Sequence, residues 1–91
     1  LASQLAETQP DARQDLADGF DRWNDPIRRG LAAMRDRGEL RPDANPDQLS
    51  LSLLASLQGG TLMTQTMRNP GPLQAALDSA IAYIHTFVPA A

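Results

Sequence analysis

The sequence predicts an all-α fold, an antiparallel helical bundle formed by a single domain of 91 residues. Apolar residues recur every three or four positions in two long segments, and a third segment between them is apolar on nearly every side. Proline and glycine separate the three segments. No stretch alternates between apolar and polar residues as a half-buried strand does. Because the links are short, neighbouring helices are expected to run antiparallel.

Residues 1–8, LASQLAET, have the pattern of a helix already under way, which Gln9 and Pro10 would end. The chain begins with Leu1 and not with Met. We therefore expect residues 1–91 to be a truncated domain, whose longer N-terminal part was removed or is not ordered.

Residues 11–37 show the strongest helical periodicity. One apolar stripe contains Leu16, Phe20, Trp23, Ile27, Leu31 and Met34. Aspartates gather in the first half of this segment and arginines in the second, which matches the helix dipole. Pro26 conflicts with a straight helix, because its ring clashes with the carbonyl of Arg22 and removes one hydrogen bond. We expect a bend of more than about 20° or a break there, with Asp25 capping the second part.

Residues 45–68 form the segment around which the others must pack, because no charge lies between Asp47 and Arg68. Asn45 is a suitable N-cap, Pro46 suits the first helical position, and Gln48 occupies the place of a capping-box residue. The pair Gly59 and Gly60 costs about 1 kcal/mol per residue in a helix. This cost suggests that a partner helix or a ligand approaches the backbone closely.

The two flanking segments complete the bundle. Gly38 is a helix-ending residue, and residues 39–44 read as a short polar link anchored by Leu40. After the turn at residues 69–72, a last amphipathic helix is expected over residues 70–88, and Pro89 follows it.

Composition excludes several classes of function. The chain has no cysteine and one histidine, so thiol catalysis and zinc sites built from cysteine or histidine clusters are excluded. A net charge of −3 argues against a nucleic-acid surface in this segment. The serines, threonines and glutamines of residues 45–68 argue against a membrane span. No targeting signal is apparent, and cytoplasm is the expected location.

No catalytic motif, metal site or cofactor site is predicted. Five aspartates in residues 11–25 recur at helical spacing, and such a cluster is more often a solvated face than a metal site. His85 is expected to be a surface or interface histidine. The chain is therefore not expected to be an enzyme.

One face of residues 45–68 mixes leucines with amides, as the wall of a small-molecule pocket does. The aromatic stripe of residues 11–37 would lie opposite, although the same residues also fit an ordinary helical core. The residues expected to bind an apolar ligand are Phe20, Trp23, Ile27, Met34, Leu54, Gln58, Thr61, Leu62 and Gln65.

The other face is small at its centre, so a second helix could come close, and we interpret it as the side of a homodimer. It carries Leu49, Leu53, Ser56, Gly60, Met63 and Met67, beside Gly59.

In order and spacing, four phrases resemble the C-terminal half of TetR-family transcriptional regulators: DRWNDPIRRGL, RGELRPDANPDQL, LLASLQGGTLMTQ and RNPGPLQAALDSAI. The resemblance implies that the last two long helices pair with those of a second subunit in a four-helix interface. It thereby adds Leu77, Ile81, Ile84 and His85 to the interface. It also implies an effector pocket beside these helices, and an operator bound only by an N-terminal helix-turn-helix that this chain lacks.

Two functions therefore remain open. The first is the effector-binding and dimerisation part of a TetR-like repressor, in which an unknown apolar molecule releases operator DNA. The second is a stand-alone helical interaction module without a ligand. An enclosed apolar cavity beside Trp23 and Gln58 would favour the first, and a filled core would favour the second.

Overall fold

The computed structural model describes residues 10–90, which form three helices and no strand. They are α2 (Pro10–Asp36), α3 (Pro46–Met67) and α4 (Gly71–His85). This confirms the all-α prediction, with bounds that differ from the expected ones by a few residues at most. The predicted helix of residues 1–8 lies outside the described part of the chain.

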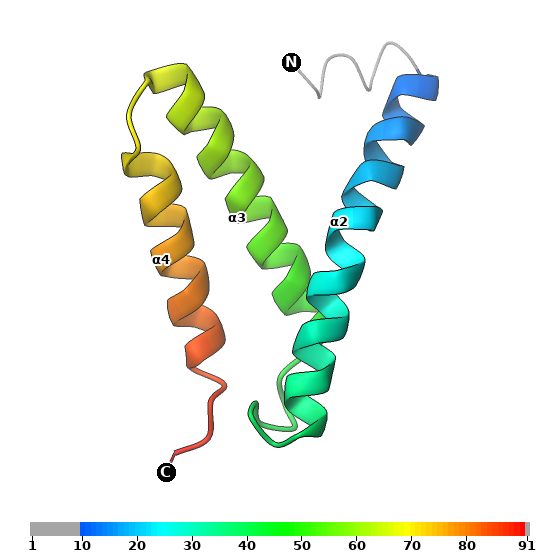
Figure 1. Ribbon diagram of the computed structural model, residues 1–91, viewed down its shortest axis with the longest axis vertical. Coiled ribbons are helices and arrows are strands. Elements are labelled where there is room, and N and C mark those ends of the chain that lie inside the picture. Colours follow the sequence, from blue (N-terminus) through cyan, green and yellow to red (C-terminus); the bar gives the residue numbers. More distant parts are fainter. Residues whose placement is uncertain (1–9, 91) are drawn as a thin grey trace.

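The helices form one layer with α3 in the middle (Figure 1). α3 packs against α4 along its length and against α2 over a shorter stretch, and no Cα atom of α2 lies within 8 Å of a Cα atom of α4. α2 and α3 are close near residues 31–49 and diverge toward the amino-terminal end of α2 (Figure 1). The extents of 49 × 30 × 15 Å reflect this flat arrangement.

α2 continues through Pro26 as one helix of 27 residues, so the predicted break does not occur. The alternative, a bend of more than about 20° at this position, stays a prediction. Pro26 itself is exposed, and its ring therefore displaces no packed neighbour. Asp25 does not recap the helix; it forms ion pairs with Arg28 and Arg29 in the following turn. These pairs span the turn that follows the proline.

α2 ends in a Schellman motif. Gly38 has a φ of +79°, and its N–H donates to the carbonyl of Arg35. The N–H of Glu39 donates to the carbonyl of Met34. The turn directs Leu40 into the core, where it is 1% exposed.

The predicted start of α3 is confirmed, because the Oδ1 of Asn45 accepts from the N–H groups of Asp47 and Gln48. Gln48 was expected to act as a capping-box residue. Its Oε1 instead accepts a hydrogen bond from the hydroxyl of Tyr83 on α4. At the other end, Arg68 adopts the left-handed conformation and ends the helix.

The turn between α3 and α4 is held by two side chains. The Oδ1 of Asn69 accepts from the N–H of Gly71, and the hydroxyl of Thr64 accepts from the N–H of Leu73. Both bonds satisfy amides that the first turn of α4 leaves free.

The core is small, and it forms where the link between α2 and α3 packs against the carboxyl-terminal part of α2 and the first turn of α3. Leu31, Leu40, Ala44 and Leu49 form it, and the half-buried apolar residues packed against it are Ile27, Met34, Ile84 and Phe87. The link is also joined to the end of the chain, since the backbone N–H of Arg41 donates to the carbonyl of Phe87. The guanidinium of Arg41 lies 5.4 Å from the centre of the Phe87 ring.

Candidate functional site: a cleft between α2 and α3

The divergence of α2 from α3 leaves a cleft of about 400 Å³ between them. Its lining residues are Asp15, Leu16, Gly19, Phe20, Trp23, Leu57, Gln58 and Thr61. Those on α2 recur at one-turn spacing and so share one side of that helix. Phe20 is 42% and Trp23 61% exposed, which leaves both aromatic rings accessible to a ligand.

A smaller hollow of about 250 Å³ adjoins this cleft. It is lined by Phe20, Leu51, Leu54, Ala55 and Gln58. Phe20 and Gln58 line both spaces, so the two meet at this pair. The amide of Gln58 therefore lies where a ligand occupying either space would meet a polar group among apolar walls.

The structure brings together part of the predicted ligand set. Phe20, Trp23, Gln58 and Thr61 line the cleft, and Leu54 lines the smaller hollow. Ile27 and Met34 instead pack against the core cluster, because α2 and α3 are close at that level. Leu62 and Gln65 are exposed on α3 and line neither space, since α2 has diverged from α3 by that point.

Several lining residues were not predicted as ligand contacts: Asp15, Leu16, Gly19, Leu57, Leu51 and Ala55. Asp15 and Gly19 precede Trp23 by two turns and one turn of α2. Counting back from Trp23 in steps of four residues, which is about one helical turn, would have identified both residues as neighbours of Trp23 on the same side of the helix. Leu57 gave no such signal, because it belongs to neither of the two faces that the apolar pattern of residues 45–68 distinguished.

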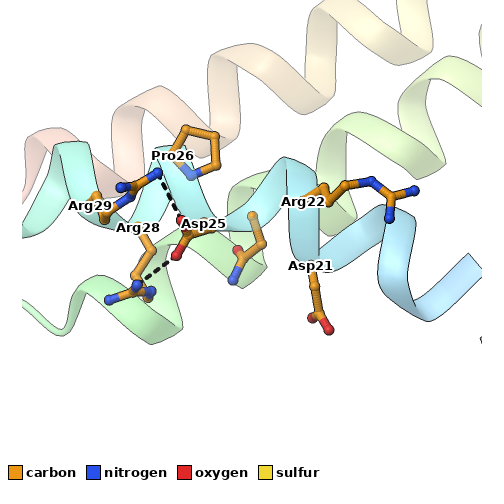
Figure 2. A pocket seen from close by; sticks show the side chains of 7 residues that line it. Asp21, Arg22, Asp25, Pro26, Arg28 and Arg29 are labelled. Atoms are coloured by element: carbon orange, nitrogen blue, oxygen red, sulfur yellow. Dashed lines mark hydrogen bonds and ion pairs between the residues drawn. The ribbon is translucent and has the colours of Figure 1, made fainter.

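A third hollow, shown in Figure 2, runs along the side of α2 around Pro26. All of its lining residues belong to that one helix, so no second element closes it. Asp25 lies at its centre, 2.7 Å from a nitrogen of Arg28 and 2.9 Å from one of Arg29. The hydrogen bond from Arg28 lowers the pKa of Asp25 below its ordinary value. These charges are already paired with one another, and the hollow carries no further assignment.

The predicted interface residues fall into three groups by exposure. Leu49 and Gly60 are buried within the chain. Leu53, Ser56, Leu77 and Ile84 are half-buried. Gly59, Met63, Met67, Ile81 and His85 are exposed.

The close approach predicted at Gly60 occurs within the chain. A Cβ at Gly60 would lie 3.0 Å from the Cα of Leu73 and 3.0 Å from the Cβ of Ala76, both on α4. The interpretation of Gly60 as the centre of a dimer contact is therefore wrong. The same applies to Leu49, which is 1% exposed in the core of its own chain.

α3 retains an exposed, uncharged surface, which we call the outer face; at its edge toward α2, Leu51 and Ala55 also line the smaller hollow beside Phe20. It consists of Leu51, Ala55, Gly59, Leu62, Met63 and Thr66. Leu51, Leu62 and Met63 are each more than half exposed. An apolar helix surface of this kind is typical of an interaction site.

The described residues contain no group of three or more potential metal ligands of the His, Cys, Asp or Glu type. Within the same residues, no helix is long and apolar enough to cross a membrane.

Comparison with known families matches residues 1–80 to the family described as "Tetracyclin repressor-like, C-terminal domain". No curated protein and no solved structure matches the chain. The family match covers most of the sequence and agrees with the helical architecture. The chain therefore belongs to the C-terminal domains of TetR-family transcriptional regulators, the part of these regulators associated with ligand binding and dimerisation.

Proposed function

We propose that this chain is the effector-binding and dimerisation part of a TetR-like transcriptional repressor. In this proposal an apolar small molecule binds between α2 and α3. Its binding releases operator DNA held by an N-terminal helix-turn-helix domain of the whole regulator. The observation that carries the proposal is the family match combined with a cleft that exposes Phe20 and Trp23 beside the amide of Gln58.

The arrangement of the helices supports a mechanism. The amino-terminal half of α2 diverges from α3 (Figure 1), and the cleft lies between the two helices there. A ligand that fills the cleft would change the angle between the two helices. In a dimeric regulator such a change alters the spacing of the two DNA-reading heads, and only a ligand that prefers one spacing shifts the equilibrium.

The second subunit would be another copy of the chain, bound through the outer face of α3 and the exposed residues of α4. The outer face carries no charge and is apolar, as the centre of an interface is. Met63, Met67, Ile81 and His85 remain in the proposed interface because all four are exposed.

The test uses the whole protein in which this sequence occurs. Its reading frame should include about a hundred residues before this domain that open with a basic helix-turn-helix pattern. The protein should bind DNA from its own upstream region, and an apolar ligand that quenches Trp23 should release that DNA. The release is measured by fluorescence anisotropy of labelled DNA.

A protein that dimerises but binds neither DNA nor any apolar ligand would contradict the proposal. That outcome would support the alternative of a stand-alone interaction module.

A further inference from the structure

We propose that the cleft between α2 and α3 selects lipophilic monocations, that is, molecules with an apolar ring system and a single delocalised positive charge. This inference rests on the proposed function and specifies the ligand class of the same site. It follows from the charge, the aromatic surface and the shape of the cleft.

Among the described residues that line the cleft, Asp15 is the only charged one. The other lining residues are apolar, aromatic or neutral and polar, and neither Lys nor Arg is among them. This carboxylate attracts a cation that enters the cleft and repels an anion, while the guanidinium of Arg22, whose Nη2 lies 3.8 Å from the Cβ position of Gly19, opposes the preference from outside the lining. The lining therefore discriminates by the sign of the charge.

The aromatic rings strengthen this preference. A cation over the face of a tryptophan or phenylalanine ring is attracted by the electron density of the ring. Trp23 and Phe20 are both exposed enough to offer their rings. Because Trp23 lies two turns after Asp15 on α2, the carboxylate and the indole lie along the same side of the helix.

Gly19 lies between these two side chains and keeps the path between them open. A Cβ built at Gly19 would have one neighbour within 4 Å, the Nη2 of Arg22 at 3.8 Å. The floor between the carboxylate and the indole is therefore bare backbone, against which a flat ring can lie.

The surroundings of the cleft are also acidic. Residues 11–22 of α2 contain four aspartates and two arginines. Arg22 lines the hollow around Pro26 and not the cleft itself, although its Nη2 lies 3.8 Å from the Cβ position of Gly19. Its charge weakens the attraction beside Gly19, but four aspartates against two arginines leave residues 11–22 with a net negative charge.

The cleft volume of about 400 Å³ lies within the range typical of small-molecule sites. This size suits a matched pair of probes. Tetraphenylphosphonium and tetraphenylborate have nearly the same shape and apolar surface but opposite charge. Isothermal titration calorimetry of both ions with the whole protein, at fixed ionic strength, separates the effect of charge from that of apolar burial.

The phosphonium ion is expected to bind about tenfold more tightly than the borate ion, a ratio typical of one weak ion pair combined with one cation–π contact. Asp15→Asn should reduce this ratio to about threefold or less. Asp21→Asn is the matched control, because it removes the same charge from a residue of α2 that does not line the cleft. It should leave the ratio nearly unchanged.

Equal binding of the two ions, tighter binding of the borate ion, or an equal effect of Asp15→Asn and Asp21→Asn would overturn the inference. The proposed function would survive these results if a neutral apolar ligand still bound beside Trp23 and released DNA. Failure of every apolar probe to bind, whatever its charge, would overturn both.

Discussion

At the scale of single residues, Gly60 determines how closely α3 and α4 can pack. Two of the atoms that a Cβ at Gly60 would meet are backbone atoms, the Cα of Leu73 at 3.0 Å and the carbonyl oxygen of Pro72 at 3.3 Å. Backbone atoms cannot move aside as the end of a flexible side chain can. Position 60 therefore requires a glycine because α4 packs closely against it, and not because its backbone adopts a conformation that only glycine allows.

Gly60→Ala is expected to be less stable than Gly59→Ala by about 1–3 kcal/mol, the usual cost of overpacking. Both substitutions add the same methyl group to α3 and gain the same helix propensity. A Cβ at Gly59 would meet no atom within 4 Å. The comparison therefore isolates the contact with α4. The free energy of unfolding is measured by urea denaturation, and equal stability of the two variants would contradict the packing described here.

The sequence indicated that Gly60 needed a close neighbour but not which one. A glycine pair lowers the stability of a helix, which suggests that something packs closely against the backbone. That neighbour can be a partner subunit, a ligand or another helix of the same chain. Asn45 was more predictable. Its role depends only on the residues that follow it, and its Oδ1 does accept from Asp47 and Gln48 as expected.

α2 contains a proline in its interior. The ring of Pro26 is exposed to solvent, and the ion pairs of Asp25 lie in the turn that follows it. Pro26 lacks an N–H, so the carbonyl of Arg22 has no helical donor. The break expected at Pro26 does not occur, because the other 26 residues of α2 continue the helix on both sides of it.

Pro26→Ala is expected to raise the free energy of unfolding by about 1–3 kcal/mol, because it restores a backbone hydrogen bond and removes a clash. Pro72→Ala is the control, since Pro72 lies in the first turn of α4, where a proline removes no helical bond. Its effect should be close to zero. Thermal unfolding followed by circular dichroism measures both. A Pro26→Ala variant less stable than the wild type would show that the proline has a structural role.

The helices themselves were predictable, and their relative placement was not. Helical periodicity located the three segments to within a few residues, because each repeats its apolar positions locally. The same periodicity identified two faces of α3 but could not assign the face with Gly60 to α4 of the same chain. That assignment depends on the turn at residues 69–72, which folds α4 back onto α3.

The three helices of residues 10–90 lie in a single layer, which cannot enclose much apolar surface. The radius of gyration is 15.3 Å, whereas a compact chain of this length would have about 12 Å. Large apolar side chains remain exposed on α3, among them Leu51, Leu62 and Met63. Covering the outer face with a second copy would bury this surface, which supports the proposed homodimer.

Leu62→Glu combined with Met63→Glu is expected to convert the dimer to a monomer, because the new charges would be buried without partners in the interface. Gln65→Glu is the control, since it adds a negative charge to an exposed residue of α3 outside the outer face. Light scattering at micromolar concentration measures the mass. A dimer that persists in the double variant would rule out the outer face as the interface.

We propose that an effector controls DNA binding through the cleft between α2 and α3. The most direct test is a dose–response of operator release by one effector in the whole regulator. Trp23→Ala and Gln58→Leu should each raise the effector concentration needed for release by about tenfold or more, as expected for the loss of one to two kcal/mol of contact. DNA affinity without effector should not change. Gln65→Leu, which alters an exposed amide outside the cleft, should behave like the wild type. Unchanged release of DNA in both Trp23→Ala and Gln58→Leu would show that the effector does not act through this cleft.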